Sequence, residues 1–162
     1  MDSLALMQRV RVVLVRPQIA GNIGSIARLM ENFGAGALFL VTPQVRPTQP
    51  EALARSTRGE HRLQSARVVE SLETALEGCV YAVGASRRRG PTHQAEELSP
   101  RDMARTLRAR ILDGEVALLL GAEDNGLSRE DLLACDQVVR IPAQPEYPTL
   151  NVSHAAAICL YE

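Results

Sequence analysis

Lysine and tryptophan are absent from this sequence of 162 residues, so all 18 basic residues other than histidine are arginines. The absence of lysine excludes a phosphate-binding loop of the Walker type, which needs that side chain. Codon bias of the source genome is the simplest explanation for the use of arginine alone. Clustered arginines nevertheless provide forked donors for phosphate and base recognition. Two clusters occur, one at residues 87–89 and one formed by Arg101, Arg105, Arg108 and Arg110.

Cysteine is scarce, and Cys79, Cys135 and Cys159 are far apart and without the spacing of a metal site. They favour reduced thiols in a cytoplasmic protein. No apolar run reaches the length that a bilayer needs, and no charged-then-apolar leader opens the sequence. We therefore expect no metal and no membrane attachment. The net charge of −1 excludes a general attraction to nucleic acid, so any RNA contact must depend on local clusters.

Strand-like and helix-like apolar segments alternate along the sequence. Hydrophobic residues make up 46% and charged residues 23%, and we assign residues 1–162 to a single domain. Strands are predicted at residues 10–15, 37–41, 67–69, 80–83, 116–120 and 138–141, and helices at residues 22–33, 51–56, 71–76, 100–110, from 128 and from 150. This alternation predicts an α/β fold, a parallel sheet of about six strands with helices on both faces. The last helix reaches Glu162 without a stop signal, so we expect a truncated end or a further extension.

Three polar segments follow strand-like runs, at residues 21–28 (GNIGSIAR), 121–128 (GAEDNGLS) and 141–151 (IPAQPEYPTLN). Parallel α/β proteins bind ligands at such strand ends. The glycine spacing after Gly21 does not match the G-x-G-x-x-G dinucleotide fingerprint, and the serines lack a nucleophile elbow. Taken singly, Arg28 has the ordinary explanation of a solvated helix residue, and Asn151 that of a helix cap. Their joint occurrence at strand ends indicates a functional site.

The three segments, in this order, resemble the signature motifs of the SPOUT superfamily of knotted RNA methyltransferases, in its TrmH-like branch acting on ribose 2′-hydroxyls. The resemblance covers nearly the whole chain. Within the branch, residues 83–89 (VGASRRR) and 145–147 (PEY) are most similar to the enzymes that methylate nucleotide 32 of the tRNA anticodon loop. The resemblance also implies a C-terminal trefoil knot, one of the rare exceptions to unknotted topology.

S-adenosylmethionine is the methyl donor that the resemblance implies, held mostly by backbone groups and leaving S-adenosylhomocysteine as product. The implied cofactor-binding residues are Ala85, Ser86, Arg87, Gly121, Ile141, Pro148, Thr149 and Leu150. Glycine at position 121 suits a backbone that must approach the cofactor closely. Arg87 departs from the Ala, Thr or Ser of many relatives, so we expect its side chain to face RNA as well.

Four polar residues carry the catalytic roles that the resemblance implies: Arg28, Asn22, Glu123 and Asn151. In-line transfer of a methyl group to a 2′-hydroxyl needs alignment and help with one proton. Arg28 stays charged, so we expect it to position the hydroxyl and stabilise developing negative charge while water or a phosphate accepts the proton. The other three are expected to orient the ribose, the arginine and the loop.

tRNA is the expected partner, bound across Arg87, Arg88 and Arg89, with Arg9 and Arg11 as additional contacts. A homodimer is also expected, since family members build the RNA side of the site from two chains. The apolar residues of the final helix, which follow Leu150 and Val152, both expected to be buried, point to the same conclusion: Ala155, Ala156, Ile158 and Cys159. Two alternatives stay open: a methyltransferase for another tRNA or rRNA ribose, and an RNA-binding relative that has lost catalysis.

Overall fold

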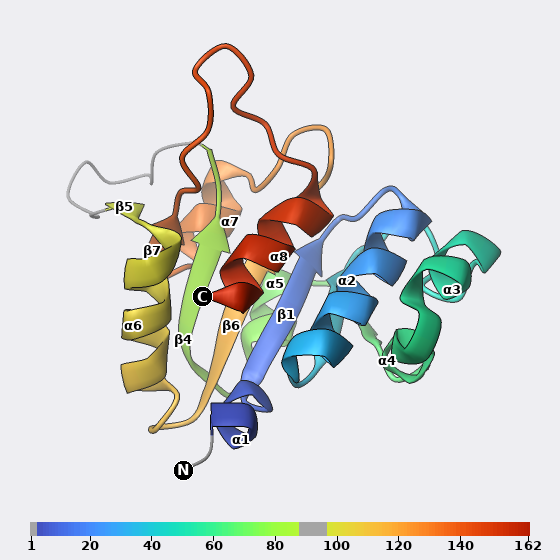
Figure 1. Cartoon of the computed structure of the whole chain (residues 1–162), viewed down its shortest axis with the longest axis horizontal. Helices are drawn as coiled ribbons and strands as arrows, with labels where there is room; N and C mark the ends of the chain where they lie inside the picture. Colours follow the sequence, from blue (N-terminus) through green and yellow to red (C-terminus); the bar gives the residue numbers. More distant parts are fainter. Residues whose placement is uncertain (1–2, 88–96) are drawn as a thin grey trace.

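A seven-stranded sheet forms the centre of the computed structural model, which describes residues 3–87 and 97–162 (Figure 1). Its strand order is β3-β2-β1-β6-β4-β7-β5, and all pairings between the described strands are parallel. The strands are β1 (Val10–Val15), β2 (Leu38–Val41), β3 (Arg67–Val69), β4 (Cys79–Ala85), β5 (Glu97–Leu98), β6 (Glu115–Leu120) and β7 (Gln137–Val139). The predicted parallel α/β fold is confirmed with one more strand than expected, because β5 pairs with β7 from a stretch assigned to a loop.

Helices connect these strands: α1 (Ser3–Met7), α2 (Ala20–Phe33), α3 (Pro50–Ser56), the 3₁₀ turn η1 (Thr57–Gly59), α4 (Glu60–Gln64), α5 (Leu72–Leu76), α6 (Pro100–Arg110), α7 (Arg129–Leu133) and α8 (Val152–Tyr161). Serine hydroxyls cap three of them, since Ser71, Ser99 and Ser128 each accept a backbone N–H of the first turn. Gly34 ends α2 in the left-handed conformation with φ 75°. α1 and α4 were not predicted.

Successive strand side chains point to opposite faces, so each strand contributes to two cores. In β1, Val12 and Leu14 pack with α2, α6 and α8, whereas Val13 and Val15 pack with α5 and α7. Figure 1 shows this division, with α2, α6 and α8 on the near face of the sheet. Both faces are therefore covered, as expected for a parallel sheet.

The final helix, α8, does not present all of the apolar residues that were expected to contact a second chain. Ala156 and Cys159 are buried in the core that α8 shares with α2, so they do not form a free apolar face. Burial raises the pKa of the Cys159 thiol to about 12. Leu150, expected to be buried, is exposed, and Ile158 and Tyr161 are the large apolar side chains that α8 leaves to solvent. No helix in the described part of the chain has the length and apolarity to cross a membrane.

Candidate functional site

A cavity of about 330 Å³ opens at the carboxyl ends of β4, β6 and β7. Its size falls in the range of small-molecule sites, about 300–1,000 Å³. From β1 the sheet continues through β2 and β3 toward one edge, and from the neighbouring β6 through β4 and β7 toward the other. Ligands of open α/β sheets bind outside the strand ends near such a change of direction. The fold therefore places the cavity where this class of protein holds its ligand.

All eight residues expected to bind the cofactor line this cavity, and they come from three separate loops: Ala85, Ser86, Arg87, Gly121, Ile141, Pro148, Thr149 and Leu150. Three of the four residues expected to act in catalysis line it too, namely Asn22, Glu123 and Asn151. Segments about 100 residues apart in the sequence thus meet at one place.

Glu123, Asn22 and Asn151 form a continuous hydrogen-bonded chain. The Glu123 carboxylate accepts the backbone N–H groups of Gln18 at 2.8 Å and Ile19 at 3.2 Å, immediately before α2. Asn22 Nδ2 donates to Glu123 Oε1 at 3.0 Å, and Asn22 Oδ1 accepts from Asn151 Nδ2 at 3.2 Å. This chain joins the three motif segments directly.

The two outer members of this hydrogen-bonded series, Glu123 and Asn151, also satisfy helix termini. The carboxylate of Glu123 lies at the amino end of α2, where Ile19 makes no side-chain cap. Asn151 Oδ1 accepts the backbone N–H of Ser153 at 2.8 Å and so caps α8. The ordinary explanation for Asn151 is thus correct, and it coexists with a place in the cavity wall. Glu123 thus caps α2, which is distant in the sequence, and not the helix that follows its own loop.

Gly121 is required by the loop that it opens. A Cβ at this position would lie 2.1 Å from the carbonyl carbon of Gly126 and 2.2 Å from the Leu127 nitrogen. The loop closes on itself through an antiparallel bridge between Ala122 and Gly126, and Gly126 itself has φ 67°. The loop's own backbone therefore requires glycine at this position, and close approach to a cofactor stays a prediction.

Arg87 connects two walls of the cavity. Its Nη1 donates to Thr149 Oγ1 at 2.9 Å, so the end of β4 is tied to the segment before α8. The rest of the side chain is exposed at the cavity edge. Arg87 is thus placed to hold the 147–151 segment while facing solvent.

Arg28 stands apart from the other motif residues. It lies six positions after Asn22 in α2, about 240° around the helix axis, and it does not line the cavity. Its side chain is exposed, without a hydrogen bond or ion pair to any other residue that the structure describes. The ordinary explanation, a solvated helix residue, therefore describes Arg28 within one chain. Within one chain, the guanidinium does not face the cavity.

The expected RNA contacts of Arg9 and Arg11 are corrected by the fold. Arg11 is buried, where it donates to the carbonyls of Ala75 at 2.7 Å and Glu77 at 3.0 Å and pairs with Glu115. Arg9 precedes β1 and donates to the Ile111 carbonyl at 3.1 Å. Both lie at the amino ends of the strands, opposite the cavity, and both donate to backbone carbonyls of the fold. Arg88 and Arg89 lie outside the described residues.

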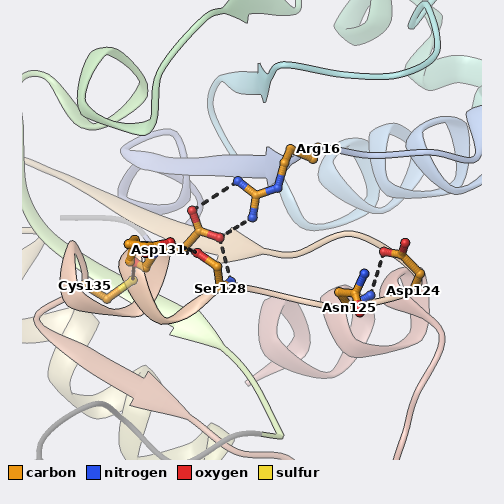
Figure 2. Close-up of polar contacts among 7 residues, drawn as sticks. Arg16, Asp124, Asn125, Ser128, Asp131 and Cys135 are labelled. Carbon is orange, nitrogen blue, oxygen red and sulfur yellow. Dashed lines mark hydrogen bonds and ion pairs between the residues drawn. The ribbon is translucent and has the colours of Figure 1, made fainter.

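Arg16 and Asp131 form an ion pair that the sequence did not predict (Figure 2). Arg16 directly follows β1 with φ 53°, and its guanidinium binds both oxygens of Asp131. The hydrogen bond to Asp131 raises the pKa of Arg16. Burial acts to raise the pKa of Asp131, but hydrogen bonds from Arg16 and Ser128 outweigh it and the net shift is downward. A charged residue ending a strand was the available signal, but its partner lies 115 positions away.

The pair ties the segment before α2 to the helix that follows the 121–128 loop. Asp131 also accepts the Ser128 backbone N–H at 2.7 Å, and the Ser128 hydroxyl accepts from the Asp131 N–H at 3.1 Å, which completes a capping box. The loop that carries Glu123 is therefore anchored at its far end as well. No group of three or more metal-ligating side chains occurs among residues 3–87 and 97–162.

A parallel α/β domain with a ligand-sized pocket of mixed polar and apolar lining at its strand ends is the class that the fold and the cavity define. The chain belongs to the SpoU rRNA Methylase family, which it matches over residues 9–161. The resemblance inferred from the three motifs is thereby confirmed.

Individual relatives agree with this family. The chain is 41% identical over 160 residues to the tRNA (cytidine/uridine/adenosine-2′-O-)-methyltransferase TrmJ of Pseudomonas aeruginosa. That match covers 97% of this chain and 61% of the relative, so the chain spans about three fifths of that protein's length. The crystal structure of TrmJ from Z. mobilis ZM4 superimposes with a TM-score of 0.86 at 32% identity, covering 93% of this chain and 66% of that one.

A third relative was solved with a ligand. The SpoU methyltransferase AviRb from Streptomyces viridochromogenes, in complex with the cofactor AdoMet, matches with a TM-score of 0.70 and 26% identity. The match covers 93% of this chain and 57% of that chain.

Proposed function

We propose that this chain transfers the methyl group of S-adenosylmethionine to a ribose 2′-hydroxyl of tRNA, at nucleotide 32 of the anticodon loop. The observation that carries the proposal is the cavity at the strand ends, with Asn22, Glu123 and Asn151 hydrogen-bonded in its wall. The TrmJ and AviRb relatives support the reaction and the cofactor. The position within tRNA rests on the resemblance of residues 83–89 and 145–147.

The cavity fits S-adenosylmethionine in its polarity. Leu120, Val139 and Ile141 would provide an apolar wall for a flat heterocycle, and the carboxylates of Glu123 and Asp124 in the lining would suit a ligand with a positive charge. Hydrogen bonds from the Gln18 side chain and the Asn125 backbone lower the pKa of Asp124, so this carboxylate is ionised at neutral pH. The cofactor supplies an activated methyl group when bound.

The residues of this chain have to align a hydroxyl and accommodate its charge. Glu123 fixes Asn22, and Asn22 fixes Asn151, so the wall that receives the ribose is held by hydrogen bonds on both sides. A guanidinium offers donors and no acceptor, so Arg28 is suited to stabilise an oxygen that becomes negative, not to accept its proton. Water or an RNA phosphate accepts the proton in this scheme.

A homodimer completes the proposed site. Arg28 is exposed and outside the cavity of its own chain, so it can act only on a cavity to which a second chain brings it. Ile158 and Tyr161 offer apolar contact on α8, where Tyr161 meets the ring of Phe33 edge-on at 6.5 Å. We expect a dimer by sedimentation at micromolar concentration, and a monomer would contradict the role of Arg28. A C-terminal knot and a cytoplasmic location remain predictions from the sequence.

Methyl transfer to unmodified tRNA transcripts tests the function. We expect label from S-adenosylmethionine to appear at nucleotide 32, and a transcript with a 2′-deoxyribose at that position to accept none. Label at another ribose would keep the reaction and change the target. Calorimetry with the cofactor separates the remaining alternative, because absence of binding at millimolar cofactor would favour an RNA-binding relative without catalysis.

A further inference from the structure

The mouth of the cavity carries an unusual share of exposed apolar surface. Tyr147, Ile19 and Leu150 all line the cavity, and all three are among the large hydrophobic side chains that the fold leaves exposed. Tyr147 is the most exposed of the three, at 80%. Solvent exposure of one aromatic ring is common, but three apolar groups around one opening indicate a surface that binds an apolar face.

The backbone holds Tyr147 in place. Its N–H donates to the Gln144 carbonyl at 3.1 Å, which closes a turn with Pro145 at the position where turns favour proline. Pro148 follows and restricts the backbone of Tyr147 to extended conformations. Beyond it, Thr149 is tied to Arg87 and Asn151 is tied to Asn22. The ring is thus presented on a segment that loses little conformational entropy when it binds.

We propose that Tyr147 is a stacking platform for the base of the nucleotide whose ribose is methylated, with Ile19 and Leu150 completing the apolar collar. This inference rests on the proposed function. A ribose that enters the cavity brings its base to the rim, and RNA-binding proteins hold such unstacked bases on aromatic side chains. Stacking uses the face that every base has, so the platform favours an extruded base without selecting its identity.

Charge at the rim fits a nucleotide better than a second protein segment. Arg87 is the basic side chain among the described residues that line the cavity, and it stays exposed beside Thr149. A guanidinium at this place can meet the phosphate next to a base stacked on Tyr147. An aromatic platform with a neighbouring arginine is the combination by which proteins bind single-stranded nucleic acid.

The absence of tryptophan makes the proposal directly measurable. The chain has three tyrosines and no tryptophan, so Y147W introduces a unique reporter that keeps a stacking face. Y161W, measured at a protein concentration at which the dimer is already formed, is the control, because Tyr161 lies in the α8 surface proposed to contact a second chain and does not line the cavity. On titration with unmodified tRNA transcript we expect the fluorescence of Y147W to be quenched and that of Y161W to stay unchanged. Binding of the transcript without quenching of Y147W would overturn the proposal.

Steady-state kinetics provide the second arm. We expect Y147A to raise KM for tRNA by about 5- to 150-fold, the loss that follows removal of one base–aromatic stack, while Y147F stays near the parent. Y147L keeps apolar bulk without an aromatic face and should resemble Y147A. Cofactor affinity of Y147A, measured by calorimetry without RNA, should equal that of the parent. A matching loss of cofactor affinity would assign the ring to the cofactor instead and overturn the proposal.

The outcomes also separate this inference from the proposed function. If the parent methylates tRNA and Y147A does so with unchanged KM, the stacking platform is wrong and the reaction stands. If the parent methylates no RNA, the proposed function fails first. A change in Y147W fluorescence with protein concentration alone would show that a second chain covers the ring, which also contradicts stacking on RNA.

Discussion

Asn22 occupies the middle of the hydrogen-bonded chain in the cavity wall, so N22D tests that chain with a nearly isosteric change. Its Nδ2 donates to Glu123 Oε1 at 3.0 Å, while its Oδ1 accepts from Asn151 at 3.2 Å. Aspartate has no amide donor, and its carboxylate would face the carboxylate of Glu123. We expect N22D to be destabilised in a pH-dependent manner and to lose methyl transfer.

The expected magnitude follows from the separation and the burial of the two groups. Asn22 is 6% exposed, so water screens the repulsion only in part. Two unit charges 4 Å apart repel by about 4 kcal/mol at an effective dielectric constant of 20. The pair relieves this repulsion by retaining one proton, and a pKa rise of about two units corresponds to about 3 kcal/mol.

The sign of the pH dependence is fixed by that rise. The carboxyl pair in folded N22D binds a proton more tightly than the unfolded chain does. Its penalty is therefore small below the unfolded pKa of about 4 and complete above the raised folded pKa of about 6. We expect N22D to lose about 3 kcal/mol of unfolding free energy relative to the parent at pH 8, and about half of that at pH 5.

Urea unfolding of the parent, N22D, E123Q and the double variant at both pH values measures these terms. In the double variant the glutamine amide at position 123 can donate to the aspartate at position 22, so we expect a favourable coupling of about 1–2 kcal/mol. E123Q alone should be destabilised, because one of its terminal atoms can no longer accept the N–H groups before α2. An N22D penalty equal at both pH values, or no coupling in the double variant, would refute the facing carboxylates.

Three further predictions concern other parts of the site. R28A should lower kcat by about 100-fold or more and leave cofactor affinity by calorimetry unchanged, because Arg28 lies outside the cavity; tenfold weaker cofactor binding with normal turnover would reject this role. G121A should lower unfolding free energy by about 1–3 kcal/mol and abolish cofactor binding, since the added Cβ would meet the Gly126 backbone at 2.1 Å; normal binding would contradict the closed loop. The depressed pKa of Asp131 contributes stability above its unfolded pKa of about 3.9 that is lost as pH falls through the lower folded pKa. D131N should therefore cost about 1–3 kcal/mol at pH 7 and flatten the acid limb of a stability–pH curve, whereas an unchanged curve would leave the Arg16 pair without energetic effect.

Local signals in the sequence predict much of the fold. β1 has the predicted bounds, Val10–Val15, and α2 ends at Phe33 as predicted, with Gly34 following it. Both follow from apolar spacing and a glycine within the segment itself. β5 was missed because two residues carry no periodicity, and it forms only by pairing with β7.

The same distinction between local signals and long-range contacts applies to the candidate site. Motif residues follow strand ends, and parallel strands bring their carboxyl ends to one edge, so the meeting of Asn22, Glu123 and Asn151 could be predicted. Arg11 could not be assigned correctly, because nothing in a β-branched strand marks an arginine that the fold buries against Phe39 and Glu115. The partner of Arg16 was equally inaccessible, since long-range pairs leave no local pattern.

Some side chains of the candidate site also cap helices, so substitutions at those positions should change stability and activity together. At a position without such a contact, a substitution should change activity alone. Glu123 satisfies the amino end of α2 and Asn151 that of α8, so the proposed catalytic geometry is set by bonds that the fold needs in any case. Substitutions there should lower unfolding free energy and turnover together. Arg28 makes no such contact with another described residue, so its removal should change turnover at constant stability. The contrast follows from which of these side chains also cap a helix, and it would distinguish residues that shape the site from Arg28, which is proposed to act on the substrate.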